Sequence, residues 1–334
     1  MHRYSYYKTA ACTLNVSIGD PQANKEEILK CIQELDSDTQ LVVFPELCIT
    51  GYTCQDLFYE HTLLNSAKQV LFEIVEELPE NLVTVIGLPL EIENKLYNCA
   101  AICFNHDILG IQVKTYIPSY NEFYETRWFS SASELKENTT FTYKNKKVPV
   151  SNHIVFKDTT TSACLGIEIC EDLWVTIPVS STHALAGANV LCNLSASNEI
   201  ISKANYRRNL VKDQSAKCYA GYVYASAGPT ESSSDLVFSG HKLICENGAI
   251  LNETKTDKII YGQIDLDHLN HDRLHYKTSM QDLFHVNYTT VEFTSKPIEE
   301  IEFDRYIDAY PFVPNNQDER IVRCLEILHI QAQG

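Results

Sequence analysis

Apolar runs of strand length alternate with segments of helical periodicity along most of the chain. Short runs rich in valine, isoleucine and leucine, bounded by polar or turn residues, are typical of β-strands. Such runs lie at 9–17, 41–44, 83–87, 98–104, 108–114, 166–169, 190–194, 222–226, 238–245 and 249–251. The polar residues at 105–107 and the Asn-Gly pair at 247–248 predict hairpins between the runs that flank them.

Helices are predicted between several of these runs. Apolar residues recur at helical spacing in 63–78, and a further helix is expected over 203–221. Asp20 before Pro21 has the form of an N-cap followed by a proline at the first helical position, so another helix should run to about Leu35. The polar stretch 132–158 indicates loops and short strands. Strands that alternate with both helices and hairpins favour the α/β class, with a mixed sheet covered by helices.

Three of the predicted strands end at a charged or nucleophilic residue. The run 41–44 leads through a proline to Glu46, the run 108–114 ends at Lys114, and the run 166–169 breaks at Cys170 into acidic residues. Ligand crevices in open α/β folds lie outside the carboxyl ends of strands, so these side chains can converge there. Glu46 would take the thiol proton, Lys114 would favour the thiolate and an oxyanion, and Cys170 would attack a carbonyl carbon. An isolated cysteine is more often a buried core residue, so the interpretation of Cys170 as a nucleophile depends on Glu46 and Lys114.

At these residues the chain resembles the nitrilase superfamily of carbon–nitrogen hydrolases, whose catalytic Glu, Lys and Cys come in this order. The resemblance is closer to one branch, the glutamine-hydrolysing domain of glutamine-dependent NAD synthetases. It rests on four ordered blocks, at 44–58, 114–129, 166–174 and 193–208, which include FPELCITGY, KTYIPSYNEFYETRWF, GIEICEDLW and NLSASNE. Together the blocks are specific, whereas any single one is weak. The resemblance implies a nitrilase-like α-β-β-α sandwich, with two mixed sheets flanked by helices.

The resemblance also implies a mechanism and a substrate. Cys170 would attack the side-chain amide of glutamine, while Lys114 and the backbone N–H after Cys170 hold the oxyanion. Glu46 would protonate the departing ammonia and then activate the water that hydrolyses the γ-glutamyl thioester to glutamate.

Two residues of the second block match substrate-contacting positions of the family. Glu125 matches an additional glutamate that positions the substrate amide and the lysine, and Tyr120 matches a tyrosine that contacts the substrate. From the residues alone, Glu125 is also readable as a surface carboxylate paired with Arg127, and Tyr120 as an ordinary half-buried tyrosine.

Glu171, directly beside Cys170, bears on which amide is hydrolysed. Many relatives that act on uncharged amides carry an aromatic residue here, whereas a carboxylate can bind the α-ammonium group of glutamine. Ser197 and Lys203 fall in the block that resembles the substrate loop, and they are expected to contact the substrate as well. Lys203 also forms, with Arg207 and Arg208, the densest basic group of the chain, for which an exposed helix surface is the simpler interpretation.

Composition limits the remaining classes of function. The chain of 334 residues is 44% hydrophobic and 21% charged, which is ordinary for a globular protein. A formal charge of −17 argues against a nucleic-acid partner, because sequence-independent binding needs basic surface. Most of the twelve cysteines lie in apolar runs and are expected to be core residues rather than a disulfide framework. The first residues lack the apolar core of a signal peptide and no apolar stretch is of membrane-spanning length, so we expect a cytoplasmic protein with no membrane partner.

The character of the chain changes from Asp267 onward. Four histidines lie close together there without partner cysteines or a defined ligand spacing, so we expect no metal site; they are His268, His271, His275 and His285. Helical spacing returns at 318–333. We therefore expect 1–270 to form the glutamine amidohydrolase domain, 271–313 a connecting segment, and 314–334 the first helix leading into a synthetase domain.

The family places an ATP-dependent synthetase domain after this helix, with a glycine- and serine-rich phosphate-binding loop that has no counterpart in the chain. ATP and Mg²⁺ are expected only for that absent domain, and no cofactor is expected for the chain itself. Because the chain stops inside an apparent helix, an excised domain is favoured over a free-standing relative. The expected partners are glutamine, the synthetase domain and further copies of the chain in a homo-oligomer.

Two other classes of function remain open from the sequence. A free-standing amidase or carbamoylase would share Glu46, Lys114 and Cys170 but act on a different small amide. A non-catalytic oligomerisation or regulatory module is the third possibility, against which the presence of all three catalytic residue types argues.

Overall fold

The computed structural model describes residues 5–278, 280–281, 285–298, 300–307, 309–310, 312–314 and 316–334. The chain divides into two compact units, Met1–Glu302 and Phe303–Gly334. The second unit contains α6 (Gln317–Gln333), a helix whose first turn is capped by the side chain of Asn316. All the strands of the described residues belong to the first unit.

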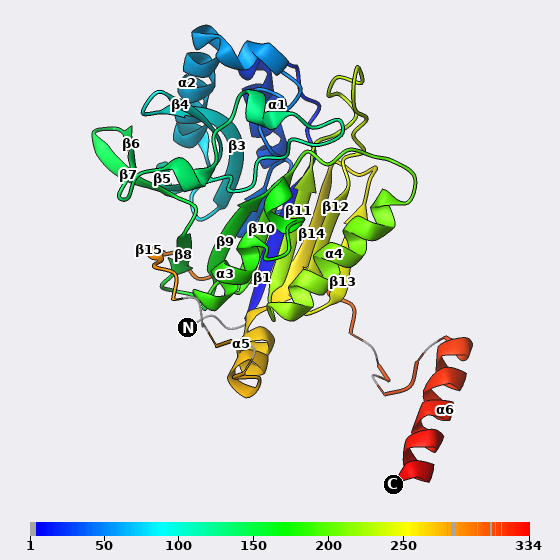
Figure 1. Cartoon of the computed structure of the whole chain (residues 1–334). Coiled ribbons are helices and arrows are strands. Elements are labelled where there is room, and N and C mark those ends of the chain that lie inside the picture. The colour runs from blue at the N-terminus through cyan, green and yellow to red at the C-terminus, as the bar shows by residue number, and fades with distance from the viewer. Residues whose placement is uncertain are drawn as a thin grey trace. The chain divides into compact units, whose positions relative to one another are not determined.

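Two mixed β-sheets form the centre of the first unit (Figure 1). The eight-stranded sheet comprises, in spatial order, β14 (Ile259–Asp265), β1 (Tyr6–Cys12), β2 (Leu41–Val43), β3 (Val83–Ile92), β4 (Lys95–Phe104), β5 (Asp107–Val113), β7 (Lys146–Ser151) and β6 (Thr140–Tyr143). The seven-stranded sheet comprises β13 (Ala249–Thr254), β12 (Lys242–Glu246), β11 (Gly221–Ser226), β10 (Val190–Ser195), β9 (Cys164–Ile169), β8 (Ile154–Asp158) and β15 (Thr289–Phe293).

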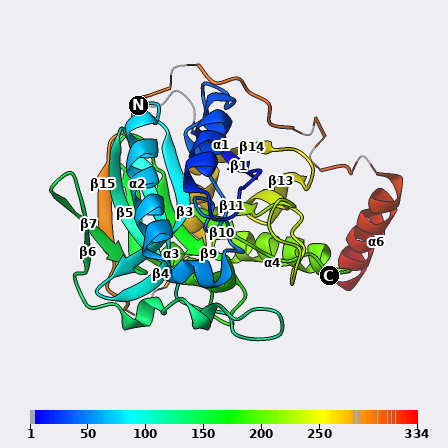
Figure 2. The same cartoon turned by 90° about the horizontal axis from the view of Figure 1, so that it is seen from above.

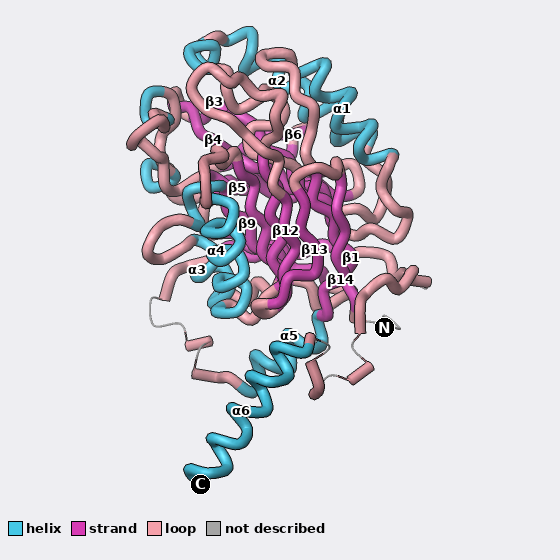
Figure 3. The backbone as a smooth tube through the Cα atoms, turned by 90° about the vertical axis from the view of Figure 1, so that its right-hand side faces the viewer, coloured by secondary structure: helices cyan, strands magenta, loops and turns pink. Residues whose placement is uncertain are grey.

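Helices cover the outer face of each sheet. On the eight-stranded sheet, α1 (Pro21–Gln33) lies beside α2 (His61–Glu77), which packs on β3 and β5 (Figure 2). On the seven-stranded sheet, α3 (Val179–Leu185) packs on β9, and α4 (Lys203–Lys217) packs on β11 and β12. Figure 3 shows α3 and α4 on one side of the strands and α1 on the other. The predicted α-β-β-α sandwich of two mixed sheets is confirmed.

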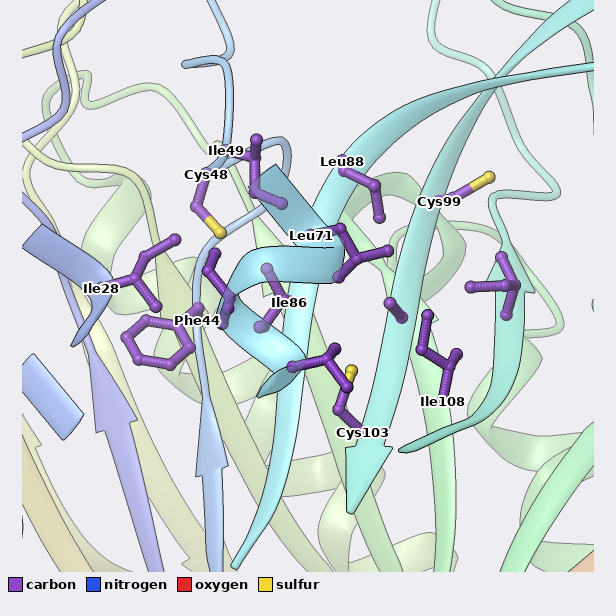
Figure 4. Packing of buried hydrophobic residues seen from close by; sticks show 14 of the residues in the cluster. Ile28, Phe44, Cys48, Ile49, Leu71, Ile86, Leu88, Cys99, Cys103 and Ile108 are labelled. Atoms are coloured by element: carbon purple, nitrogen blue, oxygen red, sulfur yellow. The ribbon is translucent and has the colours of Figure 1, made fainter. Parts of the chain in front are cut away.

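Apolar clusters hold these layers together. One cluster joins α1 and α2 to the eight-stranded sheet and includes Ile28, Leu71 and Ile86 (Figure 4). A second lies between the two sheets, where Val43 of β2 and Ile167 of β9 are both fully buried. Each such side chain contributes about 1.5–3 kcal/mol when removed from water, so the strand ends that follow are held on a rigid base.

The start of α1 is predicted correctly from the sequence, whereas neither bound of β1 is. The side chain of Asp20 accepts a hydrogen bond from Ala23 N at 3.1 Å and caps α1, as predicted. The strand predicted over 9–17 ends already at Cys12. Its last part leaves the sheet because Ser17 N donates to the side chain of Asn24, at 2.7 Å, rather than to a neighbouring strand.

The sequence pattern did not predict α3, β14, α5 (Leu266–His275) or β15. Of these, β15 lies inside the segment 271–313, for which a connection was expected. It pairs in parallel with β8, with Thr289 opposite Ile154, and so adds an edge strand to the seven-stranded sheet. The first compact unit includes this strand and continues to Glu302, and the boundary of the amidohydrolase domain at 270 stays a prediction.

All the cysteines are free, and all but Cys324 are buried, as predicted for core residues. In the histidine-rich segment the rings of His271 and His275 lie 4.2 Å apart along α5. Among the described residues, no group of three or more His, Cys, Asp or Glu side chains is arranged to hold a metal ion. No helix in the described part of the chain has the length and apolar character needed to cross a membrane.

Candidate active site

Glu46 lies just past β2, on a loop that passes close to β3. A Cβ atom at Gly87 of β3 would lie 2.5 Å from Leu47 N and 2.6 Å from Pro45 O, so this approach of two backbones requires glycine. Glu46 N also donates to Ser195 O, at the end of β10, at 3.4 Å. The loop therefore bridges the two sheets, and it leaves the Glu46 side chain only 1% exposed.

Lys114 follows β5 and is fully buried. Its Nζ atom donates to Glu46 Oε1 at 2.6 Å and to both carboxylate oxygens of Glu125 at 2.8 Å. Burial by itself lowers the pKa of Lys114, but the charges of Glu125 and Glu46 outweigh it and hold the pKa well above its usual value. The ammonium group is thus a permanent cation between two buried carboxylates.

Glu125, at the start of a short 3₁₀ helix, is not the surface carboxylate that its neighbour Arg127 suggested. It is 2% exposed, and besides Lys114 it accepts a hydrogen bond from the Tyr52 hydroxyl at 2.7 Å. Arg127 points elsewhere and pairs with Asp56 at 2.7 Å. Of the two interpretations left open by the sequence, the structure supports the one that places Glu125 beside the lysine.

Cys170 stands directly after β9 with a φ angle of 47°, in the left-handed region that a cysteine rarely adopts. Asp172 fixes this turn, because its carboxylate accepts from Ile169 N at 3.1 Å and from Thr115 N at 3.0 Å, just past Lys114. Backbone strain at a single residue costs about 1–3 kcal/mol and commonly marks a functional position. Cys170, which is 6% exposed as a residue, is held at the tip of a rigid turn.

The charges of the site act on the thiol. Burial raises the pKa of Cys170, the carboxylates of Glu46 and Glu125 raise it further, and the Lys114 cation opposes them. Burial also raises the pKa of Glu46 to about 7, against the lowering effect of Lys114. The resting thiol is therefore protonated beside a carboxyl group that titrates near neutrality, which is the arrangement needed for proton transfer from sulfur to Glu46.

The sequence predicted that Glu46, Lys114 and Cys170 would converge at strand ends, and the structure brings them together. The crevice, however, is not at the edge of one sheet. Glu46 and Lys114 come from the eight-stranded sheet and Cys170 from the seven-stranded sheet, so the site lies where the two sheets face each other.

The remaining predicted residues are Tyr120, Glu171, Ser197 and Lys203, of which Glu171 directly follows Cys170 in the chain. The hydroxyl of Tyr120, which is 48% exposed, lies 3.0 Å from both carboxylate oxygens of Glu171. Lys203 Nζ donates to Asn198 Oδ1 and lies over the ring of Trp174, 5.1 Å from its centroid. Burial lowers the pKa of Lys203, and the charges of Cys170, Glu122 and Glu171 oppose this shift.

Ser197 lies beside the turn of Cys170 because β10 pairs in parallel with β9, with Leu194 opposite Ile169. Its hydroxyl oxygen accepts from Arg207 Nη2 at 3.1 Å, and the same guanidinium donates to Asn198 O at 2.9 Å. The expectation of an exposed helix surface is wrong for Arg207, which is fully buried and lies 2.9 Å from His241 Nδ1. The guanidinium holds the loop that carries Ser197.

Sequence reasoning missed four residues that organise the site, namely Tyr52, Gly87, Asn98 and Asp172. Asp172 and Tyr52 fall in the blocks of family resemblance, so their position was a usable signal. Asn98 sits as a single amide in an apolar strand run, and an isolated buried amide requires hydrogen-bond partners. It donates to Glu46 Oε1 at 2.7 Å.

The chain is similar to known proteins over most of its length. Residues 8–273 match the family described as carbon-nitrogen hydrolase. The chain is 34% identical over 346 residues to glutamine-dependent NAD(+) synthetase of Mycobacterium tuberculosis, covering 100% of this chain and 51% of that protein. It is 30% identical over 252 residues to glutamine-dependent NAD(+) synthetase of Homo sapiens, covering 72% and 35% respectively. The chain thus spans about half the length, or less, of these relatives.

Solved structures show the same fold. A glutamine-dependent NAD(+) synthetase from Cytophaga hutchinsonii aligns with a TM-score of 0.69 and 29% identity, over 78% of this chain and 43% of that one. A carbon-nitrogen hydrolase from Helicobacter pylori aligns with a TM-score of 0.65 and 17% identity, over 85% of this chain and 98% of that one. The nitrilase-like fold is confirmed, and the chain belongs to the carbon-nitrogen hydrolase family, the nitrilase superfamily.

Proposed function

We propose that the chain hydrolyses the side-chain amide of glutamine through a Cys170 thioester and releases glutamate and ammonia. The ammonia would serve an ATP-dependent synthetase domain, outside this chain, that amidates deamido-NAD to NAD. The observation that carries the proposal is the buried Glu46–Lys114–Glu125 group, whose charges act on the Cys170 thiol. The names of the relatives support glutamine as the amide and a synthetase as the partner.

The catalytic cycle follows from the positions of the protons. Glu46 takes the proton of the Cys170 thiol, and the sulfur attacks the amide carbon. Lys114 and the backbone N–H after Cys170 stabilise the oxyanion of the tetrahedral intermediate. Glu46 then protonates the departing nitrogen, which leaves as ammonia, and a thioester remains. Water gives a proton to Glu46 and its hydroxyl group to the thioester carbon, and Glu46 passes this proton to the departing sulfur, which releases glutamate and restores the thiol.

The charges around the site favour an amino-acid amide. Glutamine carries an α-ammonium group and an α-carboxylate, and the site offers Glu171 for the first and Lys203 for the second. Glu171 directly follows Cys170 in the chain, and the charges of Glu171 and Lys203 each act on the pKa of the other group. A small neutral amide would gain nothing from either charge, and this is the reason for preferring glutamine over the substrates of a free-standing amidase.

The proposed function is tested by ammonia release from a panel of amides. The panel should contain glutamine, asparagine, propionamide and an N-carbamoyl amino acid, each measured as kcat/KM. We expect glutamine to be preferred. Preference for propionamide or for the carbamoyl compound would assign the chain to the free-standing amidases or carbamoylases, and no turnover of any amide would favour a non-catalytic module.

Replacing Glu171 by glutamine tests the origin of the specificity. If the carboxylate binds the α-ammonium group, Glu171→Gln removes a charge-assisted hydrogen bond worth roughly 1.5–3 kcal/mol, so kcat/KM for glutamine should fall about tenfold or more. The matched substrate is glutaramic acid, which keeps the amide and the carboxylate but lacks the amino group. Its kcat/KM should change little.

Tyr120→Phe is the companion variant, since it removes the hydroxyl that contacts Glu171 but leaves the negative charge. It should weaken glutamine less than Glu171→Gln does. Equal losses for glutamine and glutaramic acid in the Glu171 variant would mean that the substitution disturbs Cys170 next door, and the assignment of Glu171 to the ammonium group would be wrong.

A further inference from the structure

The two oxygens of Glu46 are in different environments. Oε1 accepts two hydrogen bonds, from Lys114 Nζ at 2.6 Å and from Asn98 Nδ2 at 2.7 Å. Oε2 is buried and accepts none from the described residues. A buried carboxylate oxygen without a hydrogen-bond donor raises the free energy of the folded state. A proton of the substrate or of a water molecule can serve as this donor.

Asn98 is placed to make this distinction. It lies in β4, where Pro89 of β3 is its strand partner, and it is fully buried. Its backbone oxygen accepts from Lys114 N at 3.0 Å, while its side-chain amide donates to Glu46. Asn98 therefore binds both the backbone of Lys114 and the carboxylate that pairs with the Lys114 ammonium group.

The orientation of the Asn98 amide follows from its neighbour. If the amide were turned over, its Oδ1 atom would face Glu46 Oε1 and two acceptors would be in contact. Lys114 divides its hydrogen bonds between Glu46 and Glu125, whereas the amide of Asn98 is committed to Glu46 alone among the bonds of the described residues. Asn98 is thus the neutral, dedicated donor of the site.

We propose that Asn98 is a positioning residue that assigns separate roles to the two oxygens of Glu46. Oε1 is held by Asn98 and Lys114, and Oε2 is left as the oxygen that exchanges protons with the thiol, the leaving nitrogen and the attacking water. The turnover readout of this inference rests on the proposed function. Asn98 itself lies outside the four blocks of family resemblance.

The inference predicts a change in the pH dependence of the enzyme. The titratable groups that act with Glu46 are Lys114, Glu125, Tyr52 and Cys170. The Asn98 bond favours the ionised form of Glu46 and so lowers a pKa that burial raises to about 7. Without this bond the carboxyl group should hold its proton to higher pH, and a protonated Glu46 cannot accept the thiol proton.

The first test is the pH profile of kcat/KM for glutamine between pH 5 and 9. The acid limb of the full chain should lie near pH 7, and Asn98→Leu should move it up by about one pH unit. Asn98→Asp, which keeps the size of the side chain but places a second carboxyl group against Glu46, should also move it up and serves if the leucine variant does not fold. Thr84→Val is the matched control, because Thr84 of β3 is an equally buried polar residue whose hydroxyl has no partner among the described residues.

A second readout does not depend on turnover. The carboxyl stretching band of Glu46, isolated by infrared difference against Glu46→Gln, titrates with the residue itself. Its midpoint should rise in Asn98→Leu and remain unchanged in Thr84→Val. A midpoint and an acid limb that both stay in place while kcat falls at every pH would overturn the role of Asn98 and leave only packing. A raised midpoint in a chain that hydrolyses no glutamine would instead refute the proposed function and retain the effect of Asn98 on Glu46.

Discussion

Replacing Cys170 with alanine is expected to abolish the release of ammonia from glutamine while leaving the fold intact. The variant has no atom that can form the thioester, and loss of a nucleophile typically lowers kcat by about 10⁴-fold or more. The side chain is small, although it belongs to an apolar cluster, so the cost in packing should be modest. Turnover is measured as ammonia from glutamine, and folding by circular dichroism.

Cys164→Ala is the matched control for this variant. Cys164 is buried at the start of β9, the strand that Cys170 follows, and it belongs to a different apolar cluster from Cys170. It should keep its turnover and lose only some stability, and Cys48→Ala and Cys54→Ala should behave in the same way. Undiminished ammonia release by Cys170→Ala would refute the assignment of the nucleophile.

The parts of the site that could be predicted from the sequence are those set by short-range patterns. Glu46, Lys114 and Cys170 each follow an apolar run that ends abruptly, and the end of a strand is visible in the order of the residues. The interpretation of Glu125 needed the structure, because a carboxylate beside an arginine in sequence gives no sign of which cation it contacts. Its actual partner, Lys114, comes from a different segment.

The parts that escaped prediction depend on contacts between distant segments. Arg207 looked exposed because its neighbours on the helix are polar, but its partners Ser197 and His241 come from two loops outside the helix. β15 joins the sheet through β8, more than a hundred residues earlier in the chain. Periodicity reports which face of an element is apolar, and it carries no information about which remote backbone completes a hydrogen bond.

The buried group of Glu46, Lys114 and Glu125 matters both for the proposed activity and for the stability of the fold. Two carboxylates with nearly no exposure share one ammonium group, with Lys114 Nζ 2.6 Å from Glu46 and 2.8 Å from Glu125. A buried ion group contributes little net stability when intact, because desolvation offsets most of the attraction. Removing its only cation is different, since two buried negative charges would then remain without compensation.

Lys114→Met is therefore expected to remove amide hydrolysis and to lower the free energy of unfolding by about 3–5 kcal/mol at pH 8. The loss of stability should depend on pH in a defined direction. In the variant the pKa of Glu46 rises further above its value of about 7, while in the unfolded chain it stays near its ordinary value. A carboxyl group whose pKa is raised in the native state stabilises the folded variant at low pH, and this stabilisation is lost as the pH increases. The variant should therefore approach the parent in stability near pH 5.

Urea denaturation at pH 5 and pH 8 measures this difference, and two further variants make it specific. Lys8→Met removes another buried lysine of the same sheet, paired with Asp36 and Asp38 at 2.8 and 2.7 Å, and should lower stability while turnover remains. Adding Glu46→Gln and Glu125→Gln to Lys114→Met removes the uncompensated charges and should restore most of the lost stability without restoring activity. If instead Lys114→Met were as unstable at pH 5 as at pH 8, the loss would come from packing, and the electrostatic account of this site would fail.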